Sequence, residues 1–370
     1  MSVLAGTKTG GEKYPALTGV RAVGATIVFF DHFPFSPDAH LTVNVMAFFF
    51  ALSGFLIVRI YYEQVELTGR WLSKYFVNRF ARIYPVYFLL LGIAVCLQHE
   101  AGPLDLFLNY TLTHGLFHGA DLIIQPSWSL TTEECFYFLA PGLMLLTRAR
   151  GPLAPFVVGC GLLLAALLVA RLGGGFAGFL GTTGFVLSIT FFGHFVEFFA
   201  GAFLALAVMK LEKTGSIQLP GHKYTLLGSA AVAVLCTAMI LIYRHPPLNS
   251  LAIIAINNFL IPVPIAVLYW GLLRETTLLS RILSGRLFGL LGRGSYSFYL
   301  LHTLIINYVS VPFLLPHSGS RAACVMLTFI VTWLVAIALF LFYEEPVNLF
   351  LRRKFRSKEQ WVGVQATLFK

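Results

Sequence analysis

The stretch Gly19–Phe33, GVRAVGATIVFFDHF, has the apolar composition of a membrane helix but contains Arg21 and His32. Ionisable side chains are costly in lipid, so within a membrane helix they face the interior of a bundle or a water-filled cavity. The stretch therefore predicts one helix of a polytopic bundle. It also raises the question of what an arginine and a histidine do at that depth.

The whole chain has the composition of a membrane protein. Of its 370 residues, 58% are hydrophobic and 11% are charged, and the mean hydropathy is +0.80, whereas about 25% of an ordinary soluble domain is charged. Apolar runs of bilayer-spanning length recur, and the alternating pattern of strands is absent, which argues against a β-barrel. The predicted fold class is all-α, a polytopic membrane helix bundle of about ten transmembrane helices.

The expected spans are 17–33, 41–60, 77–97, 128–147, 152–171, 191–209, 225–243, 251–272, 294–315 and 321–343. The glycine-rich stretch 173–190 leaves room for a re-entrant segment.

The basic residues predict the orientation of the chain. With these spans, only Arg171, Arg244 and Arg321 fall on one side of the membrane, and the other 23 of the 26 lysines and arginines fall on the opposite side. Because basic loops stay in the cytoplasm, both termini are expected there, in a multi-pass protein of the cytoplasmic membrane. The net charge of +10 then reflects topology and attraction to membrane lipid, and no nucleic-acid partner is expected.

Three units are expected: a cytoplasmic N-terminal segment over 1–16, a membrane domain over 17–346 and a basic cytoplasmic tail over 347–370. No cleavable signal peptide is evident, because the first apolar run is already a span with an internal arginine. The five cysteines show no metal-ligand spacing, so no metal site is expected. No internal repeat of the kind that many transporters contain is visible.

Arg21 and His32 are eleven positions apart, so they share one helix face and lie about 16 Å apart along its axis. One interpretation is that Arg21 reaches lipid headgroups while His32 bonds a neighbouring carbonyl. The other is a tunnel through the bundle that holds an anion at one end and a base near the other. Histidine suits the base because its ordinary pKa lies near neutrality.

Two further groups of residues interrupt the second and third spans. Ser53 and Gly54 form either a small-residue packing notch or a source of a hydroxyl and freed backbone amides for a site. Arg79 and Arg82 are three positions apart and share a helix face. They either anchor the helix at the cytoplasmic edge or form a phosphate clamp, a task for which guanidinium groups are well shaped.

Glu133 and Glu134 enter the fourth span shortly after Trp128. Two carboxylates at that depth need partners or water, unless they lie at the positive end of the helix dipole. Trp128 and Tyr137 also suit an interfacial aromatic belt. Late in the chain, Tyr299 and His302 share a helix face, and His302 is either a second core histidine or part of a site.

The last span ends with Glu344, Glu345 and Pro346. The proline is expected to stop the helix, and the two acids either pair with the basic tail or belong to a site. His194 and Glu197 are three positions apart on the sixth span, and we expect this pair to hold the bundle together.

The order and spacing of these motifs resemble the integral-membrane acyltransferase-3 family, which includes bacterial glycan O-acetyltransferases. The matching stretches are LTGVRAVGATIVFFDH, FFALSGF, RFARIYP, WSLTTEECFY, SYSFYLLH and the final Glu345-Pro346 pair. Each motif alone is weak, but the ordered set runs from Leu17 to Pro346. The chain departs from the family at Ala47 and Phe48, where an acidic residue is common, and at Gly294, where an aliphatic residue is common.

The resemblance implies transfer of an acyl group from cytoplasmic acyl-coenzyme A to a hydroxyl, often on a glycan at the outer face. It implies that the residue matching His32 is catalytic, that Arg21 is essential, and that Arg79 and Arg82 serve the donor. No tightly bound cofactor is expected, and acyl-CoA, most simply acetyl-CoA, acts as co-substrate.

A site is therefore expected in three parts. The catalytic residues are His32, Arg21 and Glu133. The acyl-donor-binding residues are Arg79, Arg82, Lys74, Ser53 and Gly54. The acceptor-side or supporting residues are Trp128, Tyr137, Tyr299, His302 and Glu345.

The expected mechanism is direct attack by the acceptor hydroxyl, with His32 as general base. A covalent acyl-enzyme on His32 or Ser53 is the variant. The alternative function is that of a secondary transporter or flippase, because intramembrane Arg, His and Glu also form proton relays.

Overall fold

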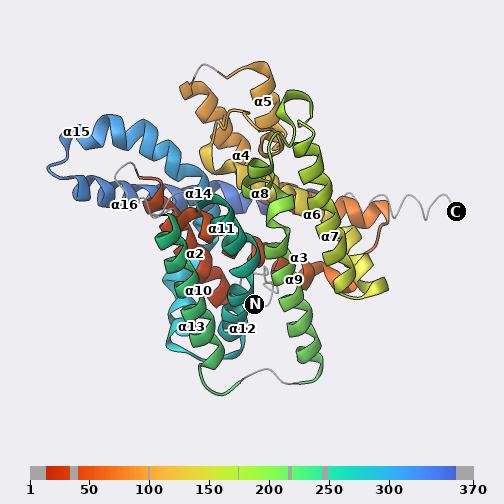
Figure 1. The fold of residues 1–370 in the computed structure, drawn as a ribbon. Coiled ribbons are helices and arrows are strands. Elements are labelled where there is room, and N and C mark those ends of the chain that lie inside the picture. The colour runs from red at the N-terminus through yellow and green to blue at the C-terminus, as the bar shows by residue number, and fades with distance from the viewer. Residues whose placement is uncertain are drawn as a thin grey trace, which may run out of the picture.

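The structure is a computed structural model that describes residues 14–33, 41–98, 101–173, 175–215, 219–243 and 249–355. Over these ranges the chain is helical apart from its connecting loops, and the described residues form no strand. The helices pack into one bundle (Figure 1), which confirms the predicted all-α fold class. Most of the expected N-terminal segment and of the expected tail lies outside the described residues.

Each expected span coincides with a helix or with a run of helical segments. The long helices are α2 (Pro15–Asp31), α3 (Leu41–Tyr61), α4 (Gly69–Gln98), α6 (Trp128–Arg150), α7 (Leu153–Arg171), α9 (Phe191–Lys213), α10 (Lys223–Tyr243), α12 (Pro262–Arg274), α14 (Arg286–Ile305) and α16 (Arg321–Leu339). The shorter ones are α5 (Pro103–Tyr110), α8 (Thr183–Ile189), α11 (Asn249–Ala255), α13 (Leu278–Leu283) and α15 (Leu315–His317). In the glycine-rich stretch, α8 leads into α9 at Thr190.

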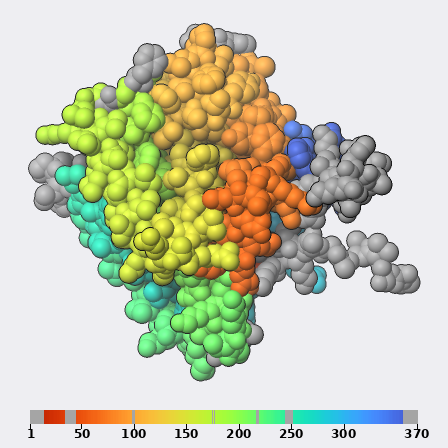
Figure 2. All heavy atoms as spheres, turned by 90° about the vertical axis from the view of Figure 1, so that its right-hand side faces the viewer, coloured from red at the N-terminus to blue at the C-terminus, as the bar shows by residue number. Residues whose placement is uncertain are grey.

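The surface of the bundle is apolar, as it is in a protein surrounded by lipid. Leu164, Leu226 and Phe342 are 67%, 68% and 83% exposed. Figure 2 shows the side of the bundle that is covered by the orange to yellow-green segments, which include α4 to α7. Among the described residues, eight helical stretches are long and apolar enough to cross a membrane. The expected spans α2 and α6 are not among them, because α2 has 17 residues and α6 contains four charged side chains.

The two helices α3 and α9 pass through the centre of the bundle in Figure 1. On one side lie α2, α10, α12 and α13, on the other lie α6 and α7, and α4 and α5 lie above. α3 packs most extensively against α9, and α2 packs against both α3 and α14. α14 in turn packs against α16. This arrangement brings α2, α3, α4, α6 and α14 around one interior space.

Glycines set the distance between α3 and α9. A Cβ atom on Gly54 would lie 2.0 Å from the carbonyl oxygen of Phe198, and one on Gly201 would lie 1.7 Å from that of Ala51. Both distances are far inside van der Waals contact, so only hydrogen fits at either position. Small residues are a main source of helix association in lipid, where burial of apolar surface supplies little driving force.

Wide π-helical turns end three of the helical segments. They are Ile256–Leu260, Ile306–Leu314 and Phe340–Glu344. Each turn places polar side chains in the interior: Asn257 and Asn258, Ser310, and Glu344. Turns of this kind add one residue to the helical repeat and so rotate the following face, which is why they are frequent at functional sites.

The expectation that Pro346 ends the last span is wrong. The helix continues through Pro346 to Phe355. The physical reason lies in the preceding π turn, which changes the hydrogen-bond pattern from i→i−4 to i→i−5 just before the proline. The missing proline N–H therefore does not break a regular ladder.

His194 and Glu197 form the buried structural pair that the sequence predicts. Both are fully buried; His194 Nδ1 lies 2.9 Å from Glu197 Oε2, and its Nε2 lies 3.0 Å from the Ser188 carbonyl oxygen. Asn257 donates to Glu197 at 3.5 Å and to Asn258 at 2.8 Å. The network joins α9 to the π turn before α12.

The glycine contacts generate a stability prediction. Gly201→Ala is expected to lower the thermal midpoint in detergent, because its methyl group meets a backbone carbonyl that cannot rotate away and overpacking costs about 1–3 kcal/mol. Gly161→Ala on α7 is the control, since nothing lies within 4 Å of its added Cβ and alanine favours helices. Equal midpoints for both variants would contradict the packing described for α3 and α9.

Candidate active site

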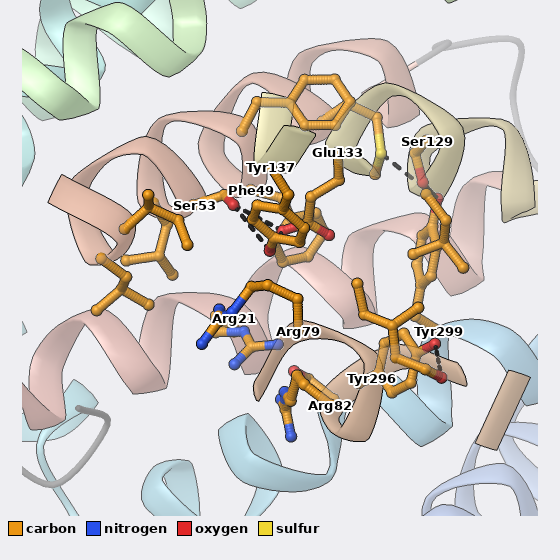
Figure 3. Close-up of a pocket in the computed structure, with 18 residues that line it drawn as sticks. Arg21, Phe49, Ser53, Arg79, Arg82, Ser129, Glu133, Tyr137, Tyr296 and Tyr299 are labelled. Atoms are coloured by element: carbon orange, nitrogen blue, oxygen red, sulfur yellow. Dashed lines mark hydrogen bonds between the residues drawn. The ribbon is translucent and has the colours of Figure 1, made fainter. Parts of the chain in front are cut away.

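A cavity of about 140 Å³ lies in the interior between α2, α3, α4, α6 and α14. Along α3 its lining runs from Met46 to Ile57, which are eleven positions apart and therefore about 16 Å apart along the helix. Its charged lining residues are Arg21, Arg79, Arg82 and Glu133, and its hydroxyl-bearing ones are Ser53, Ser129, Tyr137, Ser295, Tyr296 and Tyr299 (Figure 3). Sequence regions up to 278 residues apart, from Arg21 to Tyr299, thus meet around one space.

Arg21 reaches the cavity from α2, seven positions into the chain's first described helix. It makes no hydrogen bond or ion pair with any residue in the described ranges. Arg82 and Glu133 are close enough to act on it electrostatically. An arginine in this setting is a donor of hydrogen bonds without a protein acceptor.

Arg79 is held by tyrosines. Its Nη2 donates to the Tyr61 hydroxyl at 3.3 Å, and its guanidinium lies 5.5 Å from the ring centroids of both Tyr61 and Tyr137. These cation–π contacts orient the side chain but leave its charge unneutralised. Its Nε is buried and finds no partner among the residues that the structure describes.

Arg82, by contrast, has a carboxylate partner. Its Nη1 lies 2.5 Å from Glu344 Oε1, and the Ser297 hydroxyl donates to the other Glu344 oxygen at 2.6 Å. Glu344 is 2% exposed and belongs to the π turn at the end of α16. The cavity lining itself contains three arginines and one carboxylate, Glu133, a formal surplus of two positive charges, and Glu344 pairs with Arg82 from outside the lining. Such a cavity attracts an anionic or strongly dipolar ligand.

Glu133 lies opposite the arginines in Figure 3, within a cluster of hydroxyl groups. The Ser53 hydroxyl lies 2.7 Å from Glu133 Oε1 and 3.1 Å from the Tyr137 hydroxyl oxygen, and the Tyr137 hydroxyl donates to the same Glu133 oxygen. Tyr75 fixes this helix further by donating to the Tyr137 carbonyl at 3.0 Å. Ser53 thus has a carboxylate, a potential proton acceptor, at hydrogen-bond distance.

Hydrogen bonds from α14 and from the preceding loop fix the start of α6. The Tyr299 hydroxyl donates to the Pro126 carbonyl at 2.9 Å and lies 2.8 Å from Ser129 Oγ. The Ser127 hydroxyl donates to a backbone carbonyl at 2.5 Å, so His114 Nε2, 3.1 Å from Ser127 Oγ, is the donor of that pair. Burial lowers the pKa of His114 to about 4, so this ring remains neutral.

His32 lies beyond the cavity lining, at the end of α2. It is half-buried, and its Nδ1 lies 2.9 Å from the Val28 carbonyl oxygen. Its ring centroid is 5.0 Å from that of His302, and the His302 centroid is 5.9 Å from that of Tyr299. Because Tyr299 lines the cavity, an aromatic row connects the arginine-lined space with His32.

The remaining predicted site residues lie outside the lining. Lys74 is exposed on α4, and Gly54 belongs to the contact between α3 and α9 within an unbroken helix, so its amide is not freed. The Trp128 ring centroid is 6.4 Å from that of Phe50, a lining residue. Glu345 is half-buried and makes no contact with the cavity among the described residues.

Sequence reasoning missed Glu344 as the partner of Arg82, Ser297 as the donor to Glu344, and Tyr61 as the partner of Arg79. The acidic pair before Pro346 was visible in the sequence. Which of the two acids faces the interior, however, depends on the rotation of the helix at that point. Tyr61 lies at the end of α3, where nothing in its local sequence distinguishes it from an interfacial tyrosine.

Comparison with known proteins gives a family and two relatives. A family described as an acyltransferase domain matches residues 14–343. Peptidoglycan O-acetyltransferase OatA of Listeria monocytogenes is 27% identical over 180 residues, which are 42% of this chain and 28% of OatA. Protein 2 in picA locus of Rhizobium radiobacter is 30% identical over 152 residues, which are 33% of this chain and 78% of the relative. No solved structure matches.

The ion pair between Arg82 and Glu344 can be tested by stability. Glu344→Gln keeps the shape of the side chain but leaves Arg82 without its counter-charge, and loss of one partner of a buried pair costs up to about 3–5 kcal/mol. Because Arg82 is 25% exposed, water screens part of that loss, and we expect a smaller drop in the thermal midpoint of several degrees.

Glu345→Gln is the matched control and is expected to leave the midpoint unchanged. Adding Arg82→Gln to Glu344→Gln is expected to recover part of the loss, because no unpaired charge remains. An equal effect of the two glutamate substitutions would mean that Glu344 does not neutralise Arg82.

Proposed function

Because the chain belongs to the acyltransferase family, we propose that it is an integral-membrane O-acyltransferase. The donor is acyl-CoA, most simply acetyl-CoA, in the cytoplasm, and the acceptor is a hydroxyl of a cell-surface or exported glycan. The similarity to OatA, which is named as a peptidoglycan O-acetyltransferase, supports a glycan acceptor. The observation that carries the proposal is the interior cavity, which is lined by three arginines and by Tyr299, whose ring is followed by those of His302 and His32 in a row of contacts.

The donor enters from the side of Arg79 and Arg82. Coenzyme A is a polyanion at its nucleotide end, and guanidinium groups bind phosphates through charge-assisted hydrogen bonds. The unmatched charge of Arg79 and the unpartnered Arg21 support this assignment. Exposed Lys74 lies on the same helix and offers an outer contact for the nucleotide. The thin pantetheine arm then extends through the cavity toward His32.

His32 has the tautomer that a general base requires. A carbonyl oxygen only accepts hydrogen bonds, so the 2.9 Å contact with the Val28 carbonyl requires a proton on His32 Nδ1. In the neutral ring, Nε2 then carries the lone pair. We assign the uptake of the acceptor's hydroxyl proton to this nitrogen.

These groups account for each bond and each proton transfer in the reaction. The acceptor oxygen attacks the thioester carbonyl while its proton moves to His32 Nε2. The C–S bond then breaks, and the coenzyme A thiolate takes the proton from His32. Arg21, with no described partner, lies about 16 Å from His32 along α2 and is available to bind an anionic group of the donor.

An acyl-enzyme on Ser53 is the mechanistic variant. The Ser53 hydroxyl lies 2.7 Å from Glu133 Oε1, so the base that nucleophilic catalysis needs is present. Mass spectrometry of the protein after incubation with labelled acetyl-CoA and no acceptor distinguishes the two routes. A label on Ser53 supports the variant, and an unlabelled protein that still transfers supports direct attack.

The protein is proposed to lie in the cytoplasmic membrane with both termini in the cytoplasm. The clustering of basic residues in the loops of one side supports this orientation. It places Arg79 and Arg82 toward the cytoplasm and the end of α2 with His32 toward the outer face.

A proton-coupled transporter is the second candidate, because buried charges such as Arg82 and Glu344 around a cavity also occur in transporters. Counterflow of a labelled solute in proteoliposomes without any acyl donor would favour it. Consumption of acetyl-CoA by the same proteoliposomes, without counterflow, would exclude it.

We predict that His32→Gln abolishes transfer. Glutamine preserves much of the volume but cannot accept the proton, and positioned base catalysis contributes about 10²–10⁴-fold. The measurement is thioester loss from labelled acetyl-CoA by the purified protein in nanodiscs with a glycan acceptor. Full activity of a folded His32→Gln protein would refute this mechanism.

We also predict that Arg79→Ala and Arg82→Ala raise the KM for acetyl-CoA more than the KM for the acceptor, because they remove donors to phosphate. Isothermal titration with coenzyme A measures the same loss directly. Equal weakening of donor and acceptor would instead indicate that these arginines only support the fold.

A further inference from the structure

His302 is a buried histidine with an open nitrogen. It is fully buried on α14, and its Nδ1 lies 2.6 Å from the Tyr299 carbonyl oxygen. Its Nε2 is buried and has no hydrogen-bond partner within the described part of the chain. A buried polar atom left without a partner is costly and uncommon, so this nitrogen calls for an explanation.

The two neighbouring histidines have the same tautomer for the same reason. Each Nδ1 contacts a backbone carbonyl of its own helix, Val28 for His32 and Tyr299 for His302, so each Nδ1 carries the proton. Both Nε2 atoms are then lone-pair acceptors. The ring centroids are 5.0 Å apart at an interplanar angle of 79°, so the two rings are in edge-to-face contact.

We propose that His302 is a positioning residue that accepts a hydrogen bond from His32 when His32 becomes charged. In the neutral pair neither Nε2 can donate. Once the acceptor's O–H bond breaks and the proton forms an N–H bond with His32 Nε2, that N–H is shared between the acceptor oxygen and the lone pair of His302 Nε2. When the thiolate takes the proton, the pair returns to its neutral state. This inference rests on the proposed function and adds a second residue to it.

The surroundings of His302 support this role over a purely packing role. Its ring stacks on Phe298 and lies beside Tyr299, at centroid distances of 6.4 and 5.9 Å. An apolar residue would fill that space without leaving an unpartnered acceptor. In a hydrolytic triad a third group also stabilises the charged form of the catalytic histidine, although it accepts from Nδ1; on His32 that nitrogen contacts the Val28 carbonyl.

The test compares His302→Leu and His302→Gln with wild type, in the acetyl-CoA assay. His302→Leu is expected to lower kcat by about 10- to 100-fold with an unchanged KM for acetyl-CoA, as for loss of one hydrogen bond to a charged group. His302→Gln keeps an accepting oxygen and is expected to retain more activity than His302→Leu. His317→Leu is the control, because His317 has the same Nδ1-to-carbonyl contact but is exposed.

A double variant separates joint action from independent roles. If His302 acts through His32, then His32→Gln with His302→Leu is no less active than His32→Gln alone. Multiplied losses, or a fully active His302→Leu, would overturn the proposal. A wild-type protein without acyl transfer would instead refute the proposed function, which keeps the two failures distinct.

Nitrogen-15 NMR of histidine-labelled full-length protein in nanodiscs gives a readout that does not depend on a variant's folding. We expect His302 to show a protonated Nδ1 and an unprotonated Nε2. A protonated Nε2 on His302 would exclude it as an acceptor for His32.

Discussion

A charged side chain inside an apolar helix bundle must be matched by a partner or face a polar cavity, and the interior of this protein is organised by that constraint. Arg82 is matched by Glu344, and Glu133 by the hydroxyls of Ser53 and Tyr137. Arg21 and Arg79 have no carboxylate partner among the described residues. A negatively charged ligand in the cavity that they line would pair with these two arginines.

The fold follows from the same constraint. α2 is short and α6 contains four charged side chains, and both contribute charged residues to the cavity. These charges are stable there because apolar helices surround them. Close glycine contacts hold α3 to α9, and π turns direct Asn257 and Glu344 inward. The scaffold thus fixes the polar groups before any substrate arrives, which is the basis of electrostatic preorganisation.

Much of the fold was predictable, because hydropathy measures the transfer of whole helices into lipid and needs no tertiary information. The grouping of Arg21, Arg79, Arg82 and Glu133 around one space follows from the same logic, since none of them is stable facing lipid. The continuation of the last helix past Pro346 was not predictable, because a π turn leaves no clear mark in the sequence.

Individual partners were harder to predict than regions. One residue along a helix is a rotation of about 100°, so the choice of Glu344 over Glu345 depends on the phase that the π turn sets. Gly54 and Lys74 were expected at the donor site, but the first packs against α9 and the second is exposed. The pairing of His32 with His302 needed the packing of α2 on α14, which no local motif encodes.

The central claim is that acyl-CoA places its thioester in the arginine-lined cavity, facing His32. The most direct test is an experimental structure of the full-length protein in nanodiscs with a non-hydrolysable acetyl-CoA analogue. We predict nucleotide phosphates at Arg79 and Arg82, and the acyl end within the cavity, directed past Tyr299 toward His302 and His32. An analogue bound outside the cavity at saturating concentration would contradict the account.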